Sequence, residues 1–308
     1  MLAAKAPSRV PLLAADVAVA AQLACLLEVS APKPGNVSPE RHFDDLRYED
    51  FLASAAAIGA PLAGAGTRPI GATVRLAVEA TACWTRSNSN LGIVLLLTPL
   101  ARAALGENGV GTTGSFFATL RGAVRDVLET TTVDDAREVY VAIRRAAPGG
   151  LGRVDDQDVA GEPTKTLVDV MRLAADRDGI AREYATGFEM TFETGVPALE
   201  QARGDGLNWG DATVETFLRL LAAAPDTHVA RRGGPAMAAD ISRQARAVLA
   251  AGGVRTAAGR GAIGDMNRGL RDARHAGNPG TAADLTAAAI FVVLLGGGWQ
   301  GGRDAASR

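Results

Sequence analysis

Apolar residues recur at helical spacing along most of the chain, and the runs between them are rich in glycine, proline and aspartate. This pattern predicts helices that are joined by a few long loops. A loop follows the first helix, because the prolines of SAPKPGNVSPERHFDD interrupt helical hydrogen bonding, and residues 59–69 form a second break. Helices are predicted over 12–29, 48–58, 71–84, 91–105, 113–130, 132–147, 163–188, 211–224, 235–251, 265–275 and 281–295.

The same pattern predicts an all-α fold. No segment of useful length alternates with a period of two residues, and no internal repeat is visible. Aromatic residues make up only 5% of the chain, whereas hydrophobic residues make up 47%, which is enough for a sizeable core. We therefore expect one compact multi-helix domain over residues 1–308 with long functional loops, and mobile ends at 1–9 and 297–308.

Charge and cysteine content exclude several classes of protein. A net charge of -2 and a pI near 6.0 give no basic footprint for nucleic acid or an anionic membrane. Cys25 and Cys83 lie far apart and read as small buried hydrophobic residues in a reducing compartment. The apolar runs 91–105 and 285–299 are shorter than the roughly 20 residues of a spanning helix. The sequence predicts a soluble, cytoplasmic protein without a signal peptide.

The first long loop carries candidate chemistry. The sequence contains no phosphate-binding loop, zinc-protease motif, nucleophile elbow or dinucleotide fingerprint. Lys33, Gly35 and Asn36 form a compact polar turn, and Lys33 is one of only three lysines among 32 basic residues. Such a turn suits a phosphate group, because lysine supplies a point charge and glycine allows close backbone approach. An ordinary surface turn is the alternative.

Two further groups of charged residues stand out. Asp155, Asp156 and Asp158 lie together in the Gly- and Pro-rich loop 148–163, where their carboxylates could hold Mg²⁺ or simply face solvent. Arg75 and Glu79 are four residues apart and so share one face of a predicted helix. A plain exposed ion pair is the alternative for them. The three histidines show no metal-ligand spacing.

Taken together, several segments resemble the triphosphoribosyl-dephospho-CoA synthase family. The resemblance covers roughly residues 12–295, and its most specific parts are K-P-G-N, N-x-N-L-G and P-G-x-x-A-D-L. Two details differ from the usual motifs of the family. Ser89 replaces the threonine that many relatives carry, and the ending NPGTAADL is more similar to archaeal and methylotroph members. The matching stretches are KPGNVSPERHFDD (33–45), YEDFLASAAAIG (48–59), GATVRLAVEAT (71–81), SNSNLGIVLLLTPLA (87–101), 153–188, DTHVARRGG (226–234) and NPGTAADLTAAAIF (278–291).

The resemblance implies a glycosyl transfer. ATP and 3′-dephospho-CoA are joined with loss of adenine, when the acceptor 2′-hydroxyl attacks C1′ of the ATP ribose. A transition state with oxocarbenium character needs a carboxylate, a proton donor for the adenine, and cations or Mg²⁺ for the triphosphate. No phosphate-binding loop is required, because no bond between phosphates breaks.

This chemistry suggests a role for each candidate residue. We expect Glu79 to be a buried catalytic carboxylate, with Asp156 and Asp158 as further candidates for the base. A metal site is expected at Asp155, Asp156 and Asp158. The ATP and substrate contacts are expected from Lys33, Gly35, Asn36, Arg75, Asn88, Asn90, Lys165, Asp178, Arg231, Arg232 and Asp284.

Alternative functions stay open at this point. The acceptor could instead be a pterin- or furan-type precursor of a one-carbon carrier cofactor, as the ending of the chain suggests. The chain could also be a helical nucleotide-binding protein without catalysis, although a scaffold has no need of Lys33, Asn88, Asn90 and the three aspartates together. The expected partners are ATP and a dephospho-CoA-like acceptor, with neither nucleic acid nor membrane, and a homodimer is open.

Overall fold

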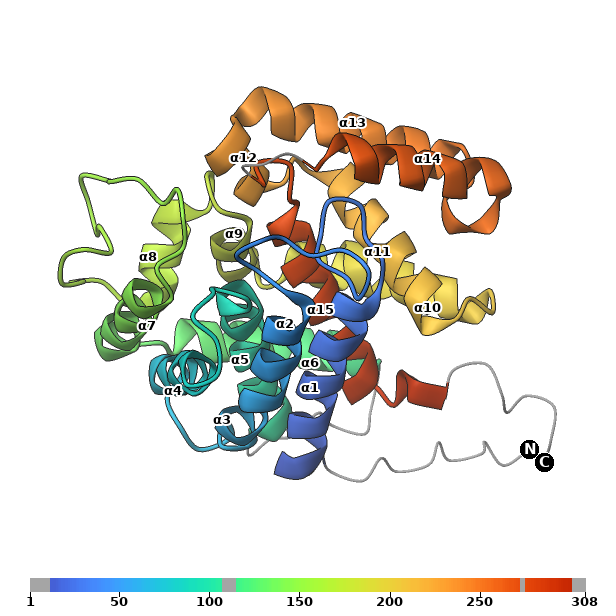
Figure 1. The fold of residues 1–308 in the computed structure, drawn as a ribbon. Helices are drawn as coiled ribbons and strands as arrows, with labels where there is room; N and C mark the ends of the chain where they lie inside the picture. Colours follow the sequence, from blue (N-terminus) through green and yellow to red (C-terminus); the bar gives the residue numbers. More distant parts are fainter. Residues whose placement is uncertain (1–11, 107–114, 272–274, 301–308) are drawn as a thin grey trace, which may run out of the picture.

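The computed structural model describes residues 12–106, 115–271 and 275–300. Within them the regular elements are helices, accompanied by one isolated bridge between Ser38 and Arg41, so the predicted all-α class is confirmed (Figure 1). The α-helices are α1 Ala14–Ser30, α2 Tyr48–Ala57, α3 Gly59–Ala63, α4 Ile70–Ala82, α5 Leu91–Leu105, α6 Phe116–Glu129, α7 Val133–Ala146, α8 Leu167–Ala174, α9 Gly179–Thr186, α10 Val196–Gly204, α11 Trp209–Ala223, α12 Thr227–Gly233, α13 Pro235–Ala250, α14 Ala257–Gly269 and α15 Gly280–Leu295. A π-helix spans Met190–Gly195, and 3₁₀ turns span Gly253–Arg255 and Gly298–Gln300.

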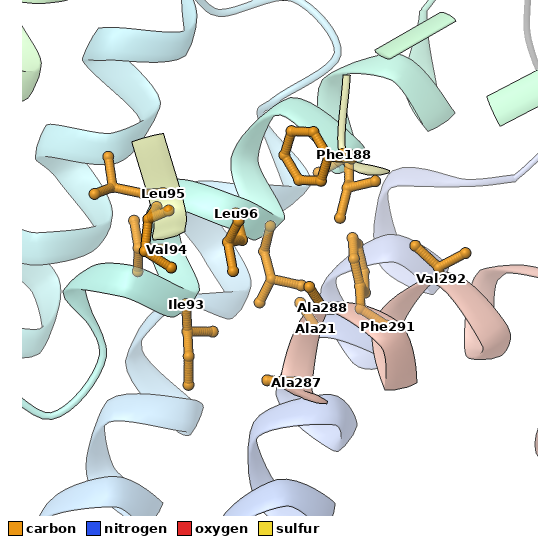
Figure 2. Close-up of a cluster of buried hydrophobic side chains, with 14 of the residues drawn as sticks. Ala21, Ile93, Val94, Leu95, Leu96, Phe188, Ala287, Ala288, Phe291 and Val292 are labelled. Atoms are coloured by element: carbon orange, nitrogen blue, oxygen red, sulfur yellow. The ribbon is translucent and has the colours of Figure 1, made fainter. Parts of the chain in front are cut away.

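Helix α15 forms the centre of the larger core. Its sequence is apolar on every side, and a helix of that kind is stable only when neighbours surround it. It contacts α1, α5, α10 and α11. Small side chains let these helices approach closely, and Figure 2 shows Ala21 of α1 gathered with Ala288 and Phe291 of α15. Helix α15 is therefore packed against neighbours on several sides.

A smaller core joins the helices α11 to α14, which lie across the upper part of the molecule in Figure 1. Phe217, Leu218 and Ile241 are among its fully or almost fully buried members. Asp226 caps α12 by accepting a hydrogen bond from the Val229 amide, at 3.0 Å. Its other oxygen accepts from the Ala282 amide at 2.8 Å, which ties α12 to the first turn of α15.

The prediction of one long helix over 163–188 is wrong. The segment divides into α8 and α9, because two residues with strong capping side chains interrupt it. The Thr166 hydroxyl accepts from the Asp169 amide at the start of α8. The Asp178 carboxylate accepts from the amides of Ile180 and Ala181, at 2.9 and 3.1 Å, and so begins α9.

Several other boundaries also differ from the prediction. A short helix, α3, occupies part of the predicted break at 59–69, and α14 begins eight residues before the predicted 265. Helices α10 and α12 were not expected. Within the predicted mobile tail, Trp299 stacks on Trp209 with ring centroids 5.6 Å apart. The other predicted mobile end, 1–9, and residues 113–114 lie outside the described residues. Within the described chain, no helix combines the length and the apolar character that crossing a membrane requires.

Candidate active site

A cavity of about 650 Å³ opens where the predicted loops meet. Its volume falls within the range of roughly 300–1,000 Å³ that is usual for small-molecule sites. The walls come from the last turn of α1 and the loop after it, residues 86–95, the helices α7 and α8 with the loop 147–159, the start of α9, α12, and the first turns of α15. In Figure 1 the loop after α1 crosses the upper end of α15, next to α9 and α12.

Two carboxyl groups line this cavity, one of them buried (Glu28) and the other partly buried (Asp284). Glu28 lies in the last turn of α1 and Asp284 in the second turn of α15. Burial raises the pKa of Asp284 well above its usual range, the negative charges of Glu28, Asp226 and Asp178 raise it further, and Arg231 acts in the opposite direction. The side chain of Asp284 therefore stays protonated at higher pH than an exposed aspartic acid and is able to donate a proton.

Lys33 does not face the cavity as predicted. Its ammonium group lies 2.9 Å from Glu28 Oε1, donates to the Glu28 carbonyl, and donates to the Ala31 carbonyl at 3.2 Å. Because an ammonium group has three donors, none is left for a phosphate. Gly35 also lies outside the cavity wall, and its amide donates to Asn267 Oδ1 at 3.0 Å. Lys33 therefore holds Glu28, and Gly35 links the loop to Asn267 of α14.

The side of the cavity formed by α9 and α12 carries both charged side chains and a neutral histidine. Arg231 donates to Asp178, both line the cavity, and Arg232 lies beside them. His228 Nδ1 donates to the Asn278 carbonyl at 3.0 Å, because a carbonyl oxygen can only accept. Burial, reinforced by the charges of Arg231 and Arg232, lowers the pKa of His228 to about 4, so this imidazole is neutral near pH 7 and Nδ1 is the donor.

The two predicted asparagines line the cavity at the start of α5. Asn88 Oδ1 accepts from the Leu91 amide at 3.3 Å, and Asn90 Nδ2 donates to Thr81 Oγ1 at 3.0 Å. Asn90 is buried, whereas Asn88 is exposed. The structure thus places both side chains where they can reach a ligand.

The three aspartates of loop 148–163 do not form the predicted metal site. Asp158 lines the cavity, but its oxygens accept from the amides of Val154 and Ala160, both at 2.8 Å. Asp156 pairs with Lys165 at 2.7 Å, and neither Asp155 nor Asp156 lines the cavity. Among the described residues, no three or more His, Cys, Asp or Glu side chains are grouped to hold a metal ion. The loop's own hydrogen bonds separate these carboxylates.

The prediction that Glu79 is a buried carboxylate is wrong. Its side chain is 47% exposed and lies outside the cavity wall. Arg75, the residue one turn before it, lies 2.6 Å from Glu138 of α7 and 3.8 Å from Glu79, so the plain surface ion pair is what the structure shows. Arg75 likewise does not reach the cavity.

Sequence reasoning missed several residues of the cavity wall. Glu28 carried a usable signal, because it is the one charged residue in the apolar second half of α1. Arg86 and Arg177 line the cavity, and neither forms an ion pair within the part of the chain that is described. His228 and His275 gave no signal, since their surroundings depend on segments far away in the sequence.

Comparison with known proteins places these features in context. Residues 14–303 match the family model described as ATP:dephospho-CoA triphosphoribosyl transferase. A protein of Pseudomonas putida named "Probable 2-(5''-triphosphoribosyl)-3'-dephosphocoenzyme-A synthase" is 30% identical over 205 residues, which are 63% of this chain and 71% of that protein. A protein of the same name from Pseudomonas paraeruginosa is 38% identical over 127 residues, 40% of this chain and 43% of that one. A crystal structure described as that of a "putative triphosphoribosyl-dephospho-coA synthase from Archaeoglobus fulgidus" is 29% identical with a TM-score of 0.60, and the match covers 80% of this chain and 99% of that one.

Proposed function

The chain belongs to the ATP:dephospho-CoA triphosphoribosyl transferase family, and we propose that it carries out this transfer in the cavity that Glu28 and Asp284 line. The observation that carries the assignment of the site is this pair of carboxyl groups. Glu28 is buried and Asp284 is partly buried, both line the cavity, and removal from water raises the pKa of each. The segments around them, which include K-P-G-N, N-x-N-L-G and P-G-x-x-A-D-L, are those that resemble the family.

The reaction requires one bond to break and one to form at C1′ of the ATP ribose. The bond from C1′ to the adenine nitrogen breaks, and the 2′-oxygen of dephospho-CoA bonds to C1′. The adenine takes up a proton as it leaves, and the 2′-hydroxyl loses one. The triphosphate stays on the transferred ribose. Such a step benefits from one protonated and one ionised carboxyl group that flank the sugar.

We assign the proton donor to Asp284, because its environment keeps the carboxyl protonated. Glu28 then stabilises positive charge on the ribose or accepts the 2′-hydroxyl proton. The Lys33 ammonium, at 2.9 Å, favours the ionised form of Glu28 and so opposes the effect of burial on its pKa. Glu28 thus lies beside a positive charge, whereas Asp284 lies among negative charges. This difference gives the two carboxyl groups separate roles.

Cations around the cavity suit the triphosphate. Arg86 and Arg177 line the wall without ion-pair partners in the described chain, and Arg231 and Arg232 lie on α12. Asn88 and Asn90 are proposed to contact the ribose hydroxyls. The described residues do not build a protein-only Mg²⁺ site, so we propose that Mg²⁺ enters bound to the phosphates of ATP and neutralises part of their charge.

The wall formed by α7 and α8 is apolar and suits the acceptor. Val139 and Ile143 of α7, Val170 and Met171 of α8, and Leu151 of the loop between them line it. We propose that it contacts the pantetheine arm of dephospho-CoA, because that arm is the least polar part of either substrate.

The proposed cellular setting follows from the substrates. ATP is an intracellular nucleotide, and Cys25 and Cys83 are free thiols, so we propose a cytoplasmic enzyme. No observation on the fold bears on a homodimer, which stays a prediction.

The experiment that tests the function is incubation of the protein with ATP, Mg²⁺ and 3′-dephospho-CoA, followed by mass spectrometry. We expect free adenine and a product that contains dephospho-CoA plus the triphosphoribosyl group, in equal amounts. Adenine release without consumption of dephospho-CoA would show that water or another acceptor is used. Absence of adenine with every acceptor, including pterin- and furan-type precursors, would contradict the proposal.

A further inference from the structure

A second, smaller cavity adjoins the first, and we call it the side cavity. Its volume is about 30 Å³, and it lies between the end of α4, the last turn of α7 and the segment 86–91 at the start of α5. Arg86, Asn88 and Leu91 line both cavities. Arg86 and Asn88 are exposed, and exposed side chains change rotamer readily. A chain of phosphate groups that starts in the main cavity can therefore extend into the side cavity.

The lining of the side cavity is positively charged. Arg86 and Arg145 supply the charge, and none of the described residues that line this cavity is acidic. Neither arginine forms an ion pair or a side-chain hydrogen bond within the described chain. The neighbouring Arg144 differs, because it donates to the Val159 carbonyl at 2.8 Å. Two guanidinium groups, each with five N–H donors, are thus left without a protein acceptor.

The helix ends beside the side cavity account for only part of this positive charge. Arg145 lies in the last turn of α7, and Arg86 lies shortly after Cys83, where α4 ends. A basic residue is favourable at such a position, because each helix C-terminus carries about half of a negative elementary charge. Two unpaired arginines therefore supply more positive charge than two helix ends neutralise. The excess charge suits a bound anion.

We infer that the side cavity binds a phosphate group of a nucleotide in the main cavity, held by Arg86 and Arg145. Guanidinium groups bind phosphate oxygens through paired hydrogen bonds. A volume of about 30 Å³ has room for roughly two water-sized groups, which suits the end of a phosphate chain and excludes a base or a sugar. The inference rests on the proposed function and adds Arg145, which lies outside the main cavity wall. Two sources supply such a phosphate, the triphosphate of ATP and the diphosphate of dephospho-CoA, and the experiment distinguishes them.

The test measures how Arg145→Gln changes the affinity for each substrate. Calorimetry gives the dissociation constants of ATP with Mg²⁺ and of 3′-dephospho-CoA for the wild-type protein and the variant. We expect the affinity for one substrate to fall about tenfold and the affinity for the other to stay within about twofold. The substrate that loses affinity is the one whose phosphate occupies the side cavity. Changes within twofold for both substrates, or an equal loss for both through a general effect of charge, would overturn the inference while leaving the proposed function intact.

Two further variants show whether the effect is local. Arg86→Gln should weaken binding of the same substrate as Arg145→Gln, and weakening of the other substrate alone would overturn the inference. Arg125→Gln is the matched control, because Arg125 is an exposed arginine of α6 that lines neither cavity and forms no ion pair within the described chain. It should keep both affinities within about twofold, and a loss as large as that of Arg145→Gln would overturn the inference. All three arginines are exposed, so each variant should fold normally, which thermal unfolding checks. If the wild-type protein bound neither ATP nor dephospho-CoA, the proposed function would fail together with the inference.

Discussion

Lys33 Nζ lies 2.9 Å from Glu28 Oε1, and the two side chains are almost completely buried. The lysine belongs to the K-P-G-N turn and the glutamate to the last turn of α1, so the turn folds back on the helix that precedes it. The ammonium group also donates hydrogen bonds to the Glu28 and Ala31 carbonyl groups at the C-terminal end of α1. The conspicuous lysine of the motif is therefore a positioning residue, and the carboxylate it holds is the group that faces the cavity.

The first prediction concerns the stability that this ion pair provides. Lys33→Met leaves Glu28 buried without its partner, and we expect the free energy of unfolding to fall by about 3–5 kcal/mol. Urea denaturation at pH 7 measures the loss. The double variant Glu28→Gln with Lys33→Met should recover much of it, since no buried charge remains. Unchanged stability combined with weaker ATP binding would instead support a direct phosphate contact by Lys33.

The second prediction concerns pH and His228. The pKa of this imidazole is about 4 in the folded protein and 6.5 without the surrounding fold. As the pH falls from 6.5 to 4, the unfolded chain binds a proton that the folded one does not, so folding is progressively disfavoured, by up to about 3 kcal/mol. His228→Gln lacks this effect. Urea denaturation at pH 7, 5.5 and 4 should therefore show the stability of the wild type falling relative to the variant. A constant difference between them would refute the assignment.

The third prediction concerns the apolar wall. Leu151 lines the cavity with 39% of its surface exposed, so Leu151→Asp should fold normally. We expect the KM for dephospho-CoA to rise about five- to tenfold, because part of an apolar contact is lost, and the KM for ATP to stay within about twofold. Leu173→Asp is the matched control, since Leu173 is 51% exposed on α8 outside the cavity wall. Equal effects of the two variants would argue against the pantetheine contact.

Helix positions were predictable where the apolar pattern was long and complete. The pattern of α15 is apolar on all sides, and the predicted 281–295 agrees with the observed Gly280–Leu295. The break between α8 and α9 was not predictable from periodicity, because apolar residues continue at helical spacing across it. Asp178 produces the break through its side-chain hydrogen bonds, and such a cap resembles any other aspartate in the sequence.

The sequence motifs predicted which segments form the site, but they did not predict the role of each residue. Gly92 of N-x-N-L-G lies so close to Asp284 of P-G-x-x-A-D-L that a Cβ atom would be 2.0 Å from Oδ2. Two motifs nearly 200 residues apart thus meet at one carboxyl group. The direction of Lys33 and the exposure of Glu79 depend on which neighbours pack against them. Those contacts come from distant segments, and a single sequence does not reveal them.

The central claim is that the Glu28 and Asp284 cavity is the catalytic site, and one paired measurement tests it most directly. Asn at position 284 keeps the shape of a protonated carboxyl group but has no acidic proton, whereas Glu79 is an exposed carboxylate outside the cavity wall. The rate of adenine release is measured for Asp284→Asn and Glu79→Gln under identical conditions. We expect a loss of about 10²–10⁴-fold for Asp284→Asn with unchanged thermal stability, and a rate within about twofold of wild type for Glu79→Gln. Near-normal adenine release by Asp284→Asn, with loss of activity in Glu79→Gln, would contradict the account.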